Sequence, residues 1–439
     1  MNIKLRLTLV NFFQLFVWGA WLTTLASYGF GFKGWSGQEF GIVFSTLGIG
    51  SIVMPAISGI IADKFISLQK LYGLHHILYG LTLFFIPLID TPGSFFWLML
   101  LAMLFYMPTL SLSNALSYTI LKNNKFDVVK VYPPIRVFGT IGFIVAMWTT
   151  NLISDPNSPL AFGFTIGTKI AAFTSMPIQC NQFYVAAFFA IVLGVFSFSL
   201  PNCPPKNEFN NNNKTWVEKL GLQAFTLFKQ PKMATFFIFS MFLGAALQLT
   251  NMYGETFIKD FANFPQFANT FVVKSANIVL SISQISETIF ILAIPFFLRR
   301  YGIKRVMVFS LVAWVLRFGF FAFGDPINSL WMIIMSNIVY GFAFDFFNIS
   351  GSLFVETTTD SKIRSSAQGV FMMMTNGFGA IFGSLTSGFL IDHYFTHNGV
   401  KDWRNIWLTF AVYALVITIA FAILFKHKHN RAQLEQIVH

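Results

Sequence analysis

Apolar stretches about as long as a membrane is thick recur along this chain, and they constrain its fold more than any other feature. A helix needs about 20 apolar residues to cross the hydrocarbon of a bilayer. Each such stretch must be helical, because lipid offers no partner for an unpaired backbone group. The sequence therefore predicts an all-α integral membrane protein with 12 transmembrane helices. The predicted spans are 6–30, 38–61, 70–89, 95–120, 134–153, 182–200, 233–256, 275–298, 304–323, 329–356, 366–392 and 405–426.

The scarcity of charge supports this prediction. Only 10% of the 439 residues are charged, 55% are hydrophobic, and the mean hydropathy is +0.65. A soluble domain carries about 25% charged residues, so the chain cannot cover a soluble surface and a soluble enzyme is excluded. A disordered chain is excluded too, because there is far too much apolar surface to bury.

The basic residues indicate orientation rather than nucleic-acid binding. The net charge is +12, which in a soluble protein would suggest a nucleic acid as partner. Here 21 of the 29 Lys and Arg residues lie at the termini and in the even-numbered gaps between spans, with the adjoining helix ends counted in. Six lie in the odd-numbered gaps, and Arg136 and Arg317 lie within spans. Cytoplasmic loops carry the excess of Lys and Arg, so both termini are expected in the cytoplasm. No nucleic-acid partner is expected.

The longest gap between predicted spans divides them six and six. Residues 201–232 contain Pro, Lys and a run of Asn, which is a linker composition. Three regions are therefore expected: an N-terminal six-helix bundle at 1–200, a cytoplasmic linker at 201–232, and a C-terminal six-helix bundle at 233–439. Within the linker, 214–229 has the pattern of a short interfacial helix. The outer gap 154–181 is long and of no clear class.

Two six-helix halves joined by a cytoplasmic connector resemble the layout of the major facilitator superfamily. A short motif between the second and third spans, Gly59 to Lys64 with Asp63, resembles that superfamily's loop signature. The glycine is expected to allow close helix approach, and the aspartate to cap or pair with a neighbouring helix end. The two cysteines, Cys180 and Cys203, fall on opposite sides of the predicted membrane, so no disulfide is expected.

Two carboxylates lie near the middle of predicted spans: Glu287 in 275–298 and Asp345 in 329–356. Burying an ionisable group there costs at least about 2.5 kcal/mol on insertion scales. Arg317 also lies within a span, and Arg136 lies in the first turns of another. Such residues almost always face a bundle interior or a wet cavity, so both carboxylates are predicted to be functional.

Other polar side chains share helix faces with these charges. Residues three or four apart lie on one face of a helix, and the rest of each helix is apolar, so the faces are predicted to line a cavity. Its amides, carboxylates and aromatic rings favour a neutral, polar, partly aromatic solute. The faces are Arg136, Thr140 and Phe143; Gln248 and Asn251, with Glu255 beyond; Gln284 and Glu287; and Tyr340 and Phe344, with Asp345 and Asn348.

Structural explanations compete with these functional ones. Gln248 and Asn251 are equally typical of a helix–helix hydrogen bond. Arg136 is either a site residue or a basic anchor at the cytoplasmic side. Arg317 is either the ion-pair partner of Asp345 or a purely structural residue, and the structural reading is favoured.

Two further groups favour packing over function. His75 and His76 are candidates for a proton shuttle, but packed histidines are commoner. Gly377, Gly379, Gly383 and Gly388 in the span 366–392 indicate close helix packing.

Six segments carry a resemblance to a known family. They are FVWGAWLTT at 16–24, YPPIRVFGTIGF at 132–143, ALQLTN at 246–251, SISQISE at 281–287, FDFFNISG at 344–351, and AQG at 367–369 with TNGFG at 375–379. In these segments the chain resembles the nucleoside:proton symporter family of the major facilitator superfamily, and the resemblance runs from the first helix to the last. The long outer gap 154–181 departs from the expected pattern.

The resemblance implies proton-coupled import of nucleosides, both purine and pyrimidine, across the bacterial inner membrane by alternating access. It places the substrate pocket on the faces that periodicity selects: Arg136, Thr140, Phe143, Gln248, Asn251, Gln284, Glu287, Tyr340 and Phe344. It assigns proton coupling to Asp345 and Glu287. The proton gradient supplies the energy, no cofactor or metal is expected, and the protein is expected to act as a monomer in the lipid bilayer.

Two other functions are compatible with parts of this pattern. A proton-coupled sugar or oligosaccharide symporter of the same fold is the alternative, because sugar sites also use carboxylates, amides and aromatic rings. A membrane receptor with a transporter fold is less favoured, because about 13 residues follow the last span. A membrane enzyme fits poorly, since no metal-spaced cluster or nucleophile–His–acid set lies near the spans.

Overall fold

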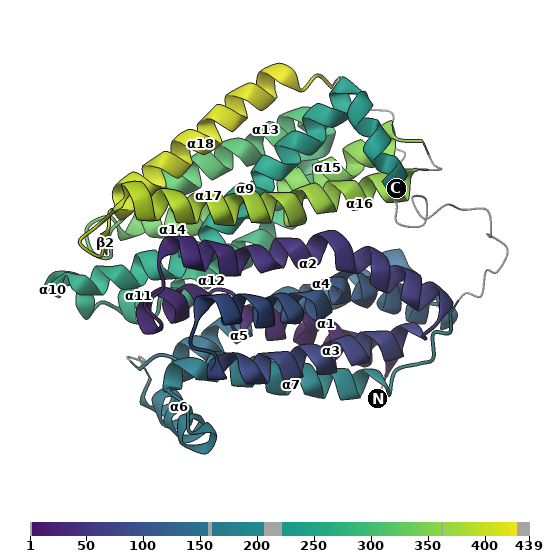
Figure 1. The fold of residues 1–439 in the computed structure, drawn as a ribbon. Coiled ribbons are helices and arrows are strands. Elements are labelled where there is room, and N and C mark those ends of the chain that lie inside the picture. The colour runs from purple at the N-terminus through teal and green to yellow at the C-terminus, as the bar shows by residue number, and fades with distance from the viewer. Residues whose placement is uncertain (1, 157–159, 206–221, 361–362, 428–439) are drawn as a thin grey trace. The chain divides into compact units, whose positions relative to one another are not determined.

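The computed structural model of the protein describes residues 2–156, 160–205, 222–360 and 363–427. These residues form two compact units (Figure 1). The first unit comprises 1–214 with 274–278, and the second comprises 215–273 with 279–439. Both are helical, which confirms the predicted all-α class.

The first unit is built from long, closely packed helices. Its principal pairs are α2 with α4, α1 with α5, and α3 with α7. Its elements are α1 (Ile3–Gly19), the π-helix η1 (Ser27–Phe32), α2 (Gly37–Lys64), α3 (Leu68–Phe85), η2 (Ile86–Leu88), α4 (Pro92–Asn123), α5 (Val128–Ile153), α6 (Ala161–Thr174), η3 (Ile178–Cys180) and α7 (Asn181–Ser197).

The second unit has more interrupted helices. Its principal elements are α9 (Pro231–Asp260), α12 (Ala276–Ile291), α13 (Ile294–Phe323), α14 (Leu330–Ala343), α15 (Asp345–Thr358), α16 (Arg364–Met372), the π-helix η6 (Met373–Phe378), α17 (Gly379–Tyr394) and α18 (Trp403–Leu424). Shorter elements are η4 (Leu222–Lys229), η5 (Phe261–Asn263), α10 (Pro265–Ala268), α11 (Phe271–Lys274) and the antiparallel pair β1 (Thr396–His397) and β2 (Val400–Lys401), with Thr396 opposite Lys401.

Nine helices in the described part of the chain are long and apolar enough to cross a membrane. The other predicted spans also coincide with helices, but these are short or broken. The predicted span 6–30 begins with α1, is interrupted by a turn after Gly19, and continues into η1. The predicted span 366–392 is divided by η6. The predicted spans 275–298 and 304–323 meet inside α13, where Gly302 turns the chain at φ 76°. Glycine adopts that backbone angle without a steric penalty.

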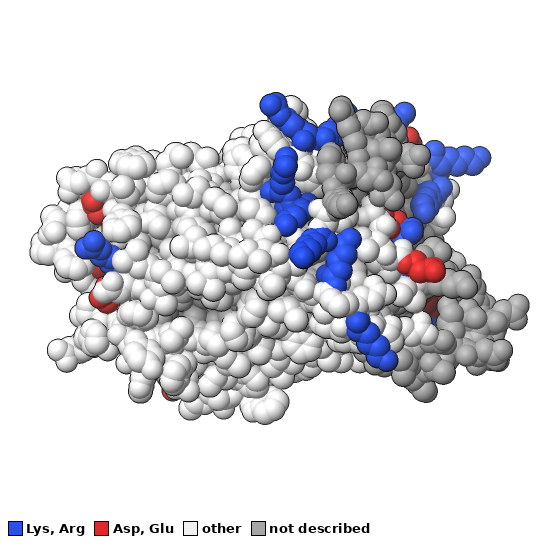
Figure 2. All heavy atoms as spheres, turned by 90° about the horizontal axis from the view of Figure 1, so that it is seen from above, with Lys and Arg blue, Asp and Glu red and all other residues white. Residues whose placement is uncertain are grey.

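Apolar side chains cover much of the outer surface, as a lipid environment requires. On α18 the residues Val412, Leu415, Val416, Ile419 and Ile423 recur at helical spacing and are 44–66% exposed. The face seen in Figure 2 shows a broad band of uncharged side chains, with a larger group of Lys and Arg toward one end than toward the other. Such a band is unfavourable in water and favourable in a bilayer.

Three sequence expectations can be checked against this packing. Cys180 and Cys203 are both free, as expected. The expectation for Gly59 is wrong within its own unit, because no heavy atom of the described residues lies within 4 Å of the place where its Cβ would be. A Cβ on Gly50 of the same helix would meet the Met103 carbonyl of α4 instead. Within the expected interfacial helix at 214–229, residues 214–221 lie outside the described part of the chain, and 222–229 form the 3-10 helix η4.

Glycines do allow close helix approach in the second unit, as predicted for the span 366–392. A Cβ on Gly379 would lie 2.5 Å from the Met241 carbonyl oxygen, and one on Gly383 would lie 2.8 Å from the Cα of Ala245. From the other side, a Cβ on Gly244 of α9 would lie 1.9 Å from the carbonyl oxygen of Thr375 in η6. Here α9 therefore touches η6 and α17 backbone to backbone.

This seam predicts the effect of adding a single methyl group. Gly244→Ala should lower the free energy of unfolding by about 1–3 kcal/mol, because a backbone carbonyl cannot move aside for the new Cβ. Gly319→Ala in α13 is the matched control, since nothing lies within 4 Å of its Cβ position. That variant should be neutral or more stable by up to about 1 kcal/mol, from helix propensity. Unfolding of the purified variants in detergent measures both, and equal stability of the two would contradict the packing.

Candidate functional site

The best-defined polar cluster lies in the second unit around the phenol of Tyr340. This side chain is 6% exposed. It hydrogen-bonds with the side chain of Gln284, and Glu287, Arg317 and Asp345 lie near enough to act on it electrostatically. The cluster therefore brings together residues from α12, α13, α14 and α15. Four of its five members were predicted from sequence as site residues, and the fifth is Arg317.

Arg317 is built into the cluster rather than left free to move. Its guanidinium donates a hydrogen bond of 2.8 Å to the Ser336 carbonyl, and the Ser336 hydroxyl donates back to the Arg317 carbonyl at 2.9 Å. The same guanidinium lies over the ring of Tyr340, 4.5 Å from its centroid. A buried arginine placed on an aromatic face supplies a fixed positive charge. The structural reading of Arg317 is thus consistent with its contacts.

The helix that carries Tyr340 is broken beside the cluster. α14 ends at Ala343, Phe344 has φ −94° and ψ −56°, and α15 begins at Asp345. Asp345 therefore occupies the first turn of a helix, where the positive end of the helix dipole favours a negative charge. Sequence periodicity placed Tyr340 and Phe344 on one continuous face, whereas the structure interrupts the helix at Phe344 itself.

Serines on neighbouring helices satisfy the carbonyls that the break and its approach require. The hydroxyl of Ser310 in α13 donates to the Ala343 carbonyl, and that of Ser286 in α12 donates to the Ile338 carbonyl. A free carbonyl in hydrocarbon costs several kcal/mol, so the Ser310 hydroxyl stabilises the interruption, while Ser286 adds a second donor to a carbonyl within α14. Sequence reasoning missed both serines, because a serine within a span carries no signal that distinguishes this use from a bond to its own helix.

Gln248 and Asn251 occupy α9 in the same unit. Gln248 is 6% exposed, and its Oε1 atom has no hydrogen-bond partner among the described residues. Asn251, one turn further on, is half-buried. Leaving a buried polar atom unpaired costs about 1–3 kcal/mol. The carboxamide oxygen of Gln248 is therefore available to a ligand hydroxyl or amine.

The other three predicted residues lie on α5 in the first unit. Arg136 is exposed, Thr140 is half-buried, and Phe143 is 9% exposed. The Phe143 ring packs against α1: its centroid is 6.3 Å from that of Trp18, and a Cβ on Gly19 would lie 2.9 Å from it. Glycines at 19 and 142 let α1 and α5 approach closely enough for this contact, since a Cβ at either would meet the other helix.

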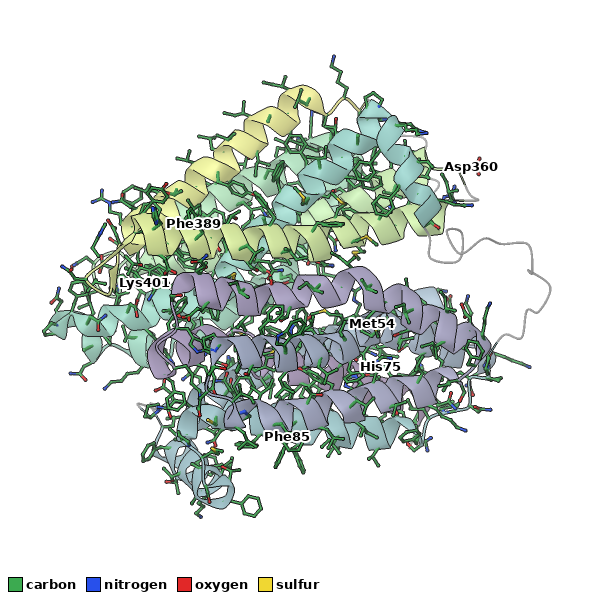
Figure 3. All side chains as sticks on the ribbon, in the orientation of Figure 1. Met54, His75, Phe85, Asp360, Phe389 and Lys401 are labelled. Carbon is green, nitrogen blue, oxygen red and sulfur yellow. The ribbon has the colours of Figure 1, made fainter. Side chains whose placement is uncertain are left out.

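His75 and His76 are packed inside the first unit, as the sequence favoured. The Nε2 atom of His75 (Figure 3) lies 3.2 Å from the Ser58 hydroxyl, and that of His76 lies 2.9 Å from the Gln14 side-chain oxygen. That oxygen also accepts from the Tyr72 hydroxyl at 2.6 Å. Gln14, which the sequence did not single out, is thus the centre of a buried network between α1 and α3.

Comparison with known proteins gives consistent results over the whole chain. A family described as "Nucleoside H+ symporter" matches residues 1–430. The nucleoside permease NupG of Escherichia coli is 48% identical over 432 residues, which cover 98% of each chain. The xanthosine permease of Escherichia coli is 47% identical over 436 residues, 99% of each chain. A crystal structure of a mutant of the nucleoside transporter NupG has a TM-score of 0.88 at 47% identity and covers 97% of this chain and 100% of the other.

The serine contacts at the break predict a measurable difference between two buried serines. Ser310→Ala should lower the free energy of unfolding by about 1–3 kcal/mol, because the Ala343 carbonyl then has no donor. Ser384→Ala is the matched control: Ser384 is equally buried, but its hydroxyl donates to Ala380 in its own helix. That carbonyl keeps its helical partner. Denaturant titration of both variants in mixed micelles tests this, and a Ser310 variant no weaker than the control would refute it.

Proposed function

This chain belongs to the nucleoside H+ symporter family, and on that premise we propose which residues bind the nucleoside, which carry the proton, and how the chain is oriented. Proton-coupled nucleoside symport is its function, and it is a transporter, not an enzyme. It is a multi-pass membrane protein with the fold of the major facilitator superfamily. The family favours nucleosides over the sugars considered as the alternative substrate.

The residues proposed to bind the nucleoside are the nine that the sequence selects. The observation that carries this assignment is the cluster around Tyr340, in which amide, carboxylate, guanidinium and phenol groups meet inside an otherwise apolar bundle. The pocket residues are Arg136, Thr140 and Phe143 on α5, Gln248 and Asn251 on α9, Gln284 and Glu287 on α12, and Tyr340 and Phe344 at the break between α14 and α15.

The chemistry of these groups suits a nucleoside. Ribose hydroxyls both donate and accept hydrogen bonds, and so do the edges of the bases. The carboxamides of Gln248, Asn251 and Gln284 offer both donors and acceptors, and Glu287 accepts from a hydroxyl pair. The ring of Phe143 or Phe344 stacks on the flat base. Solutes without these hydroxyls are rejected, because the buried amides would then lack partners.

Glu287 and Asp345 are the proposed proton carriers. Both are carboxylates within predicted spans, where ionisable residues commonly serve as proton relays, and both act electrostatically on Tyr340. Proton and nucleoside transport are coupled if occupancy by both favours the same conformational change. Two units that exchange access to the pocket are the usual means in this fold.

The proposed orientation places both termini in the cytoplasm. It is supported by the unequal distribution of Lys and Arg among the loops and by the basic group toward one end of the face in Figure 2. The relatives are bacterial permeases, so the proposed location is the inner membrane. The proposed working state is a monomer, with each chain holding a complete pocket.

Substitution of the two carboxylates should separate their roles. Asp345→Asn and Glu287→Gln keep size and hydrogen bonding but abolish protonation. The variant that lacks the proton carrier should lose accumulation of labelled uridine driven by a proton gradient, while it keeps exchange of uridine across the membrane. Proteoliposomes with an imposed gradient, with and without an uncoupler, measure both activities.

The uncoupler is the control for the wild type as well. Accumulation by the wild-type protein should fall to equilibration when the gradient is dissipated. Accumulation that survives the uncoupler would contradict proton coupling. If both variants accumulate uridine normally, the assignment of Glu287 and Asp345 as proton carriers is wrong.

The hydroxyl of Tyr340 should matter for affinity. Tyr340→Phe keeps the ring beneath Arg317 but removes the hydrogen bond with Gln284. Gln284 is then no longer held in place for the nucleoside, and the loss of about one hydrogen bond to the ligand, about 1 kcal/mol, should weaken nucleoside binding roughly fivefold to tenfold. Tyr413→Phe is the matched control: that hydroxyl donates at 2.8 Å to the Phe242 carbonyl, away from the proposed pocket. Calorimetric titration with uridine should show normal affinity for the control, and equal loss in both variants would exclude a local role for Tyr340.

A further inference from the structure

The helix α6 fills the long gap between two spans of the first unit and is too short to be a span itself. Fourteen residues in a helix extend about 21 Å, whereas the hydrocarbon core is about 30 Å thick. The helix stands out of line with the long helices at the end of its unit (Figure 1). The sequence alone could assign this gap to no class, and the proposed pocket does not use it.

One side of α6 is fixed to the end of α5. A Cβ on Gly163 would lie 2.7 Å from the Cβ of Leu152, and a Cβ on Gly167 would lie 2.3 Å from the Ile153 carbonyl oxygen. Asn181, the first residue of α7, locks this contact: its amide donates to the Ile153 carbonyl at 2.7 Å and to the Gly167 carbonyl at 2.9 Å. The helix is therefore held at the depth where α5 ends and α7 begins.

A second flank of α6 is apolar and exposed. Phe162 is 74% exposed and Phe173 is 91% exposed. Their separation of 11 residues is close to three full turns, so both rings lie on one flank. Ile166 and the exposed Lys169 lie between them on that flank. Burying a phenylalanine is worth roughly 1.5–3 kcal/mol, so exposure of both rings to water would be costly.

The exposed surface of the helix continues onto a more polar side. Thr168 is exposed about 120–140° around the helix from Phe162 and Phe173, with Thr165 between them, and Phe164 beyond it is 41% exposed. Among residues 161–174 the single charged side chain is Lys169, and there is no carboxylate. Two strongly exposed phenylalanines with a lysine between them, beside a flank that carries hydroxyls, are typical of a helix that lies in the plane of a membrane interface.

We propose that α6 is an interfacial helix whose Phe162 and Phe173 insert among lipid chains at the outer ends of α5 and α7. The lipid surface is continuous with these helices: Trp148 on α5 is 42% exposed, and Phe188 and Val195 on α7 are 61% and 60% exposed. Lys169 extends along the apolar flank so that its ammonium group meets the lipid phosphates. The helix thereby fixes the depth of the first unit in the bilayer.

Site-directed spin labels test the depth of each flank. Phe173→Cys and Thr168→Cys are each introduced with Cys180→Ala and Cys203→Ala, and the labelled full-length protein is placed in nanodiscs of phosphatidylethanolamine and phosphatidylglycerol. The ratio of oxygen accessibility to nickel-chelate accessibility should be several-fold higher at 173 than at 168, because oxygen concentrates in lipid and the chelate stays in water. Phe162→Cys should behave like Phe173→Cys.

Two results would overturn the proposal. Equal, high nickel accessibility at 168 and 173 would place α6 in water. An immobile label at 173 that is shielded from both reagents would place a protein, either a second copy or another chain, on this flank. Hydroxyl-radical footprinting of the unmodified protein serves if a labelled variant misfolds: oxidation of Phe162 and Phe173 should be several-fold slower than for the same residues in a peptide of sequence 160–176, and an equal rate would also overturn the proposal.

Discussion

Within hydrocarbon every backbone carbonyl needs a hydrogen-bond partner, and the second unit of this protein depends on how that need is met at Phe344. An unbroken helix would carry Tyr340 and Asp345 as one rigid rod. The interruption before α15 instead presents Asp345 at a helix start, and the Ser310 hydroxyl of α13 supplies a donor to the Ala343 carbonyl there. A hydroxyl from a neighbouring helix thus stabilises a local geometry that is costly in lipid.

The same region shows how a charge is kept in an apolar bundle. Arg317 is 3% exposed, and its guanidinium is held between a backbone carbonyl and two aromatic rings, those of Tyr340 and Phe321. Removing such a charge from water is costly, and the carbonyl and the two ring faces offset part of that cost. Glu287 and Asp345 are near enough to Tyr340 to act on it electrostatically. Charges of both signs therefore act on one buried phenol.

Much of this arrangement could be predicted from the sequence, and the rest could not for a physical reason. The cost of burying Glu287 and Asp345 shows that they face something polar, whatever the fold. Long apolar runs locate the helices, because in lipid the backbone of such a run must form its hydrogen bonds within a helix. The roles of Ser310, Gln14 and Gly50 depend on which helix packs against their own. The sequence of one helix does not indicate which helix that is. The same limit explains why Gly59 was wrongly expected at a close contact, while Gly244 was not noticed.

The seam of α9 against η6 and α17 has a consequence for motion. Where large side chains of one helix pack into the grooves of another, the two helices resist displacement along their axes. Here Gly244, Gly379 and Gly383 leave two nearly smooth backbones in contact, and η6 adds a wider turn of π-helix beside them. Such a joint resists separation yet allows small sliding. A transporter that alternates between two openings needs a joint of this kind.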